Sequence, residues 1–168
     1  MVQEYYEDGQ FKQLILMNCD IPEWYSYKSM KNPITFFLPS DYPSWKWKAF
    51  APCVKFQVNN VGRDLWSQLE CKVFINDIQV WSSGEVYSFL DEWRRMNIKP
   101  SPCEYMWLIV LHPCLDFQPY WDDINPSFGI NSSESTWNKF TVSFEVPSRF
   151  EDYKVSVKRC GVHVIMEE

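Results

Sequence analysis

Few side chains in this sequence could carry out acid–base or nucleophilic chemistry. The chain has only two histidines, His112 and His163. A Ser–His–Asp triad would need one of them beside a nucleophile, and the sequence has no G-x-S-x-G stretch to present such a serine. His163 alternates with valines near the C-terminus, as a surface or hydrogen-bonded residue of a strand does. The sequence therefore predicts no hydrolase triad.

Metal, carboxylate and phosphate sites are equally poorly supported. Cys103, His112 and Cys114 have the spacing C-x8-H-x-C, which matches no standard zinc pattern. Asp91-Glu92 and Asp122-Asp123 are neighbours in sequence, and such acids usually point apart on a solvated face. Neither G-x-x-x-x-G-K nor G-x-G-x-x-G occurs. We therefore expect no enzyme activity, no metal and no cofactor in this segment.

Charge and cysteine content limit the partners and the compartment. The formal net charge is −6, which disfavours nucleic acid and anionic membrane surfaces as partners. No apolar run is long enough to span a membrane, and no secretion signal is visible. The six cysteines could pair, but 168 residues can bury a core without disulfides. Reduced, mostly buried thiols are the preferred prediction.

Aromatic side chains in expected loops are the strongest candidates for function. They occur in SDYPSWKWKAF (40–50) and in DFQPYWDD (116–123). Exposed tryptophan and tyrosine beside charged residues are good anchors for a protein partner, and they also stack on sugars. The alternative is that these rings fold back as caps on the core. The candidate partner-binding residues are Tyr42, Trp45, Trp47, Phe117, Tyr120, Trp121 and Asp122.

Short apolar-rich runs closed by turn residues must position these loops. Such runs occur at 11–17, 34–38, 49–58, 69–75, 78–81, 105–112, 139–146 and 153–166. Residues 69–81 resemble a hairpin with an Asn76-Asp77 loop. Seven or more strands with little helix predict an all-β fold, an antiparallel β-sandwich. One short surface helix is expected at about 84–96, where apolar residues follow a helical stripe.

Three strands carry more specific predictions. The run 105–112 is almost entirely apolar, which favours a central strand covered on both faces. In 139–146, Phe140, Val142, Phe144 and Val146 should face inward. Pro52 cannot donate to a ladder, so its strand should be an edge or be interrupted there.

The last strand, 153–166, changes parity in its middle. Val155 and Val157 form the first apolar set, and the apolar residues at 160, 162, 164 and 166 form the second. A β-bulge explains the change, with Arg159–Gly161 as the predicted site and Gly161 free to take a positive φ. The alternative is that both faces are covered and no switch occurs.

Three stretches are similar to a known family. They are DIPEWYSYKSMKNPITFFLPSDY (20–42), WKAFAPCVKF (47–56) and VKRCGVHVI (157–165). They resemble the C-terminal jelly-roll/Ig-like domain that follows the leucine-rich repeats of plant TIR-type nucleotide-binding immune receptors. Asn18-Cys19 and Ala49 depart from the pattern, and 60–136 holds no matching motif. The similarity implies one β-sandwich domain over 14–166, with 1–13 as a lead-in from preceding repeats.

The resemblance also implies a function and a location. It suggests a cytoplasmic or nuclear plant protein whose partners are a pathogen effector and, within the receptor, the preceding leucine-rich repeats. A separate TIR domain of the receptor would cleave NAD. One alternative is a structural cap of the repeat solenoid that maintains autoinhibition. A more distant alternative is a carbohydrate-binding jelly roll.

Overall fold

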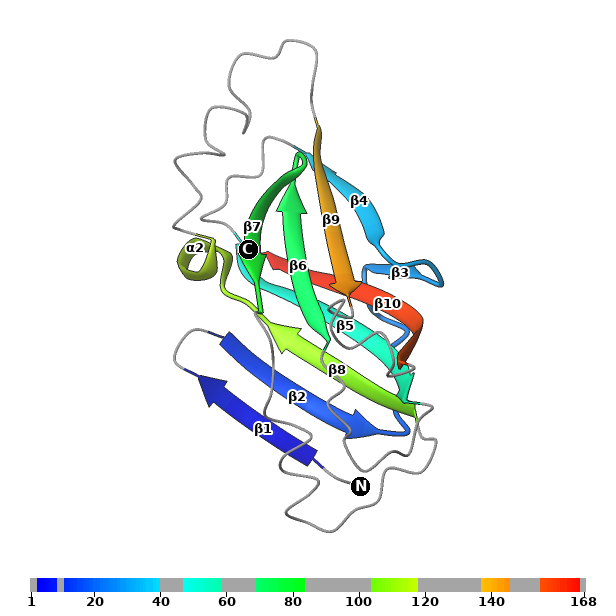
Figure 1. Ribbon diagram of the computed structural model, residues 1–168. Coiled ribbons are helices and arrows are strands. Elements are labelled where there is room, and N and C mark those ends of the chain that lie inside the picture. The colour runs from blue at the N-terminus through cyan, green and yellow to red at the C-terminus, as the bar shows by residue number, and fades with distance from the viewer. Residues whose placement is uncertain are drawn as a thin grey trace.

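Strands of alternating apolar residues form two antiparallel sheets that pack face to face (Figure 1). The computed structural model describes residues 3–8, 11–39, 47–58, 69–83, 104–117, 137–145 and 155–166. Sheet A consists, in spatial order, of β1 (Gln3–Asp8), β2 (Phe11–Met17), β8 (Glu104–Val110), β5 (Trp47–Val58), β10 (Val155–Met166) and β3 (Tyr27–Ser29). Sheet B consists of β4 (Ile34–Pro39), β9 (Trp137–Glu145), β6 (Glu70–Ile75) and β7 (Ile78–Ser82). The predicted antiparallel β-sandwich is confirmed.

The core lies between the two sheets and is rich in aromatic rings. Its fully buried side chains include Phe50, Phe56 and Trp107 from sheet A and Phe140 and Phe144 from sheet B. Burial of one such ring contributes roughly 2–3 kcal/mol of hydrophobic free energy. Among the described residues, most aromatic side chains therefore serve to hold the sheets together.

Several sequence predictions about single strands are confirmed. Asn76 and Asp77 have φ values of 49° and 67°, as a two-residue hairpin turn with positive φ at both positions requires. The strand β8 lies inside sheet A, and its consecutive residues 105–107 are all buried. In β9, Phe140, Val142 and Phe144 face the core, and the fourth residue predicted to do so, Val146, lies outside the described residues.

The prediction for Pro52 is half right. The strand β5 is an interior strand between β8 and β10, so the edge alternative is wrong. Its ladder to β8 is nevertheless interrupted, because pairing runs from Phe50–Leu111 to Cys53–Leu108 with no bridge at Pro52. The β10 side continues through Pro52 opposite Val162. The missing N–H of Pro52 therefore interrupts the ladder to β8 and leaves the ladder to β10 intact.

The parity switch in β10 and the predicted β-bulge are confirmed, but the predicted site of the bulge and the predicted role of Gly161 are wrong. The register against β5 shifts between Val157 and Arg159, which places the extra residue at Lys158 rather than at 159–161. Cys160 and Val162 then face the core. The φ of Gly161 lies outside the left-handed region. It is needed for space, since a Cβ there would lie 3.0 Å from Ile21 Cγ2 and 3.0 Å from Tyr25 Cδ2.

Those two neighbours belong to residues 18–27, here called the strap, which crosses the outer face of sheet A. Ile21 and Tyr25 are buried there against Cys53 and Met106 in a second, smaller apolar cluster. Both faces of β10 are therefore covered around Gly161, although the bulge is also present. The two alternatives considered for this strand are both partly realised.

The remaining predictions concern the chain's ends and helices. Within the expected lead-in 1–13, residues 3–8 form β1 and residues 11–13 begin β2, and both segments lie in sheet A. The helix expected at 84–96 lies outside the described residues. A four-residue helix, α2 (Pro113–Asp116), follows β8 in a region expected to be irregular. Asp116 Oδ2 accepts the His112 backbone N–H at 2.6 Å and so supports the first turn.

Candidate functional site

The structure brings together the attachment points of both loops that the sequence singled out. Segment 40–46 follows Pro39, and segment 118–136 precedes Trp137. Pro39 and Trp137 are direct cross-strand partners at the end of the β4–β9 ladder. One attachment point of each segment therefore lies at the same position of sheet B.

The other two attachment points are tied to the same part of the core. Segment 40–46 ends at Trp47, three residues before Phe50 on β5, and segment 118–136 follows Phe117. The Phe117 ring packs edge-on against Phe50 with centroids 5.9 Å apart. Phe50 in turn lies 6.1 Å from both Phe36 and Phe140, which precede Pro39 and follow Trp137 by three residues each. Phe117 thus belongs to one aromatic cluster, and each of the other three attachment points lies three residues from a ring of that cluster.

Two exposed aromatic side chains lie beside these attachment points. Phe37 is 55% exposed and Trp137 is 54% exposed on the outer face of sheet B. Phe37 is paired with Lys139, whose Nζ lies 3.1 Å from Asp77 Oδ1. Large exposed rings on paired strands combine contact area with a fixed position. We call Phe37, Pro39 and Trp137 the aromatic corner.

Sequence reasoning missed the aromatic corner, although the signal was present. In 34–38 the inward residues are Ile34, Phe36 and Leu38, so strict alternation directs Phe37 outward. The inward pattern that starts at Phe140 likewise directs Trp137 outward. The sequence prediction considered aromatic residues in loops and did not include those on the solvent-facing side of strands.

Most of the partner-binding residues predicted from the sequence have no described position relative to the aromatic corner. Tyr42, Trp45, Tyr120, Trp121 and Asp122 lie outside the described residues. Trp47 begins β5, where its backbone pairs with Met166. These residues remain predictions.

Phe117 requires a correction. It was expected to be a loop residue that contacts a partner, but its side chain has no exposed surface and belongs to the main core. The alternative that such rings fold back onto the core applies here. Phe117 therefore positions one attachment point of segment 118–136 and does not present a surface to a partner in this structure.

The second histidine does meet a serine, but the geometry is structural. His163 Nδ1 lies 2.9 Å from Ser26 Oγ and also accepts the Ser26 backbone N–H at 3.3 Å. The lone pair that a general base would use is thus already engaged with an amide. The exposed Trp24 ring packs against the same imidazole at 4.8 Å. The contact fastens the strap to β10.

Buried thiols are unsuited to nucleophilic chemistry. Burial, with a smaller contribution from Cys160, raises the pKa of Cys53 to about 12. Burial also raises the pKa of Cys160 to about 12 and that of Cys71 well above its ordinary value. These groups are protonated near neutral pH, and the thiolate is the reactive form.

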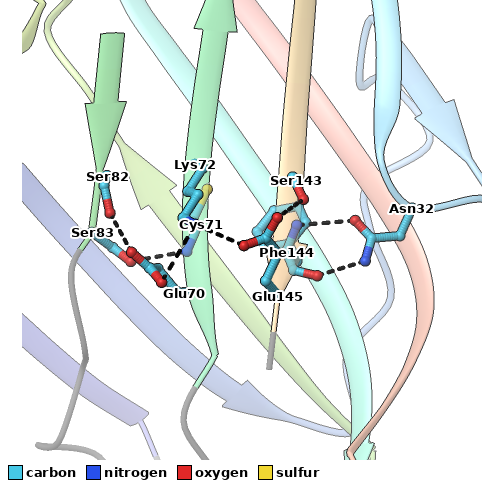
Figure 2. A network of polar contacts seen from close by, with 9 residues as sticks. All are labelled: Asn32, Glu70, Cys71, Lys72, Ser82, Ser83, Ser143, Phe144 and Glu145. Carbon is cyan, nitrogen blue, oxygen red and sulfur yellow. Dashed lines mark hydrogen bonds and ion pairs between the residues drawn. The ribbon is translucent and has the colours of Figure 1, made fainter. Parts of the chain in front are cut away.

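A polar network occupies the other half of the outer face of sheet B (Figure 2). Lys72 Nζ lies 2.8 Å from Glu145 Oε2 and 3.9 Å from Glu70 Oε2. Ser82 donates to Glu70 at 2.7 Å, and Ser143 donates to Glu145 at 3.2 Å. The hydrogen bond to Glu145 is the main reason that the pKa of Lys72 is raised. Lys72 thus bridges two carboxylates, and these three charged groups together carry a net charge of −1.

Two backbone contacts complete that network. Asn32 donates from Nδ2 to the Phe144 carbonyl at 2.6 Å and accepts the Phe144 N–H through Oδ1 at 2.9 Å, so its amide acts as one more strand residue (Figure 2). Ser83 Oγ accepts the Cys71 N–H at 2.9 Å. These contacts hold the strand ends that are opposite to the aromatic corner.

The strap is also held by an ion-pair triad. Lys55 Nζ lies 2.5 Å from Asp20 Oδ1 and 3.0 Å from Glu104 Oε2. Hydrogen bonding to Lys55 lowers the pKa of Asp20, and hydrogen bonding to Asp20 and then Glu104 raises the pKa of Lys55. The stabilisation from Asp20 is present above its unfolded pKa of about 3.9 and is lost as pH falls through its lower folded value. That from Lys55 is present below about 10.4 and is lost as pH rises through its higher folded value.

Replacement of Lys55 by methionine keeps the buried stem and removes the charge. At pH values from 5 to 9, we expect Lys55→Met to unfold at a lower urea concentration than the wild type. Near pH 2, the two unfolding midpoints should become similar. Lys139→Met is the control, because it removes a single pair to the exposed Asp77. Midpoints measured by tryptophan fluorescence across pH test this. An equal loss at pH 2 and pH 7 would show that packing, not charge, holds the strap.

The described residues were also compared with the requirements of a metal site and of a membrane-spanning helix. Within the described ranges, no group of three or more His, Cys, Asp or Glu side chains could hold a metal ion. In the same part of the chain, no helix is long and apolar enough to cross a membrane.

Comparison with known proteins identifies one family. The model of the C-JID domain matches residues 16–168. A comparison with curated proteins finds no match. The matched range includes both the strap and the last strand, the two motif-bearing segments that Gly161 brings into contact.

Proposed function

Because the chain belongs to the C-JID family, the C-terminal jelly-roll domain of plant TIR-NB-LRR receptors, we propose that it contributes to binding a pathogen effector protein. C-JID is a non-catalytic domain family, and we assign no enzyme activity to this segment. The parent receptor would act in the cytoplasm or nucleus of the plant cell. Its catalytic TIR domain would lie elsewhere in the receptor.

One observation carries the proposal, the pairing of Pro39 with Trp137. It places the starting point of segment 40–46 beside the end point of segment 118–136. Those segments contain the predicted contact residues, which are Tyr42, Trp45, Tyr120, Trp121 and Asp122, and Trp47 follows the first segment. The aromatic corner adds Phe37 and Trp137 to this set. A compact group of aromatic anchors from several segments is the usual composition of a protein-binding hot spot.

Truncation of the aromatic corner tests the proposal. We expect the double variant Phe37→Ala/Trp137→Ala to weaken effector binding by about 2 kcal/mol or more, which is roughly thirtyfold. The parent receptor should then lose its cell-death response to the pathogen isolate that it recognises. Both side chains are more than half exposed, so folding and receptor level should change little.

The matched control is Trp24→Ala. Trp24 is 68% exposed but lies on the strap, on the outer face of sheet A. Its removal should leave the response intact. A second triple variant, Trp45→Ala/Trp47→Ala/Trp121→Ala, tests the loop residues. If the receptor responds fully with both the corner and the loop residues replaced, effector recognition through this end of the sandwich is wrong.

A second candidate function is a structural cap on the preceding repeats. It is favoured by β1, which pairs with β2 and is the outermost strand of sheet A in the described part of the chain. An outer strand can accept a further strand from a neighbouring element. Constitutive signalling after deletion of the domain would support a cap that maintains autoinhibition. A silent but folded receptor would support recognition.

A further inference from the structure

A cavity opens at the end of the sandwich where the loops attach. Its volume is about 190 Å³, and its described walls are Ser26, Tyr27, Leu38, Val164 and Met166. We call it the end cavity. Leu38 immediately precedes Pro39, and Met166 is the cross-strand partner of Trp47. Two of its walls are therefore adjacent to the attachment points of segment 40–46, one in sequence and one by strand pairing.

The chemistry of the walls selects an uncharged occupant. The side chains of Leu38, Val164 and Met166 are partly buried and pack against the core. The Tyr27 ring stacks on Phe36 with centroids 4.2 Å apart, which fixes that wall. Ser26 Oγ is already in contact with His163 Nδ1 at 2.9 Å. No described wall residue carries a charge at neutral pH, so a charged group would lose hydration without a counter-charge.

The volume selects the size of the occupant. An apolar cavity of about 150 Å³ is large enough to bind benzene. The end cavity is slightly larger, so it can hold one six-membered ring. A tyrosine hydroxyl could remain in the solvent-open mouth, where its hydrogen bonds to water are kept.

We propose that the end cavity receives one phenylalanine or tyrosine side chain from the protein that this domain recognises. The proposal rests on the proposed recognition function and specifies the chemistry of the partner's central anchor. Phe37 and Pro39 flank Leu38 in β4 and point to the other face of the sheet, so the end cavity and the aromatic corner lie on the two sides of the same strand end. Buried rings in pockets surrounded by further apolar contacts are typical hot spots.

Benzene is the probe that tests the cavity without the partner. We expect saturable changes in the methyl NMR signals of Leu38, Val164 and Met166 when benzene is added to the 168-residue chain. The signal of Val73, which is fully buried in sheet B, should not change. Absence of saturable changes up to the solubility limit of benzene overturns the proposal.

A matched pair of variants tests the same cavity in the receptor. Val164→Phe places a ring in the end cavity, whereas Ile165→Phe places one on the opposite, 42% exposed side of the strand. We expect Val164→Phe to abolish benzene binding and to reduce the effector response at least about tenfold, and Ile165→Phe to do neither. If Val164→Phe lowers receptor level, Met166→Phe replaces it.

The outcomes separate this inference from the proposed function. A full response from a folded Val164→Phe receptor overturns the anchor proposal, even if the Phe37→Ala/Trp137→Ala receptor is silent. Benzene binding that persists in Val164→Phe also overturns it, because the probe then occupies another place. Loss of response in Val164→Phe and not in Ile165→Phe supports it.

Discussion

Phe50→Ala is expected to lower the free energy of unfolding by about 4 kcal/mol. Phe50 has no exposed surface, and its ring contacts Phe36 and Phe140 of sheet B and Phe117 after α2. Removal of this ring takes away a contact shared by both sheets and by the end of α2. It also leaves a cavity that the surrounding rings can only partly fill. Urea unfolding followed by tryptophan fluorescence measures the loss.

Phe37→Ala is the matched control for Phe50→Ala. It removes the same type of side chain from a strand of the other sheet, but Phe37 is 55% exposed, so the expected change is within about 0.5 kcal/mol. We also expect Phe50→Ala to reduce recognition, because each loop attachment point lies in its cluster or three residues from it. Similar stabilities of the two variants would show that the cluster does not hold the end of the sandwich.

Gly161→Val is expected to destabilise the fold by about 3 kcal/mol. The added Cβ would lie 3.0 Å from both Ile21 Cγ2 and Tyr25 Cδ2 and 3.3 Å from the Tyr27 carbonyl oxygen. Ile21 and Tyr25 are both buried, and the strap is fastened at its two ends by Asp20–Lys55 and Ser26–His163. The side chains beneath the strap therefore have little freedom to move away.

Two further variants separate crowding from other effects of the Gly161 substitution. Gly161→Ala should destabilise less, since it adds one methyl group and gains from a stiffer unfolded chain. Ile21→Ala should partly rescue Gly161→Val, with a coupling energy of about 1 kcal/mol or more in a double-mutant cycle. Unfolding midpoints measure both. Strict additivity of Ile21→Ala and Gly161→Val would mean that the crowded contact is not the cause.

The last strand shows how far sequence reasoning reaches. The change from odd to even apolar positions is readable, because side chains alternate across a strand and one extra residue inverts the alternation. The bulge site at Lys158 was not readable, because any residue between the two apolar sets satisfies the pattern. The reason for Gly161 was also hidden, because the ring above it comes from Tyr25, far away in the sequence.

In the candidate site, too, some features can be read from the sequence and others depend on tertiary contacts. Aromatic loop residues and the outward parity of Phe37 and Trp137 are local features that a sequence displays. The burial of Phe117 is not, because it depends on the end of α2 meeting β5. Whether an aromatic ring contacts solvent or core is decided by which strand lies across from it.

The sequence by itself determined most of the described strands, although not β1 and β3, together with the hairpin at Asn76-Asp77, the β-sandwich class and the family resemblance. These follow from local periodicity, turn residues and short motifs, which act within a few residues of one another. Only the tertiary structure decided that Pro39 meets Trp137, that the strap covers Gly161 and that the end cavity lies beside the loop attachment points. Strand order and sheet packing join residues about a hundred positions apart, and no local pattern specifies which of them will touch.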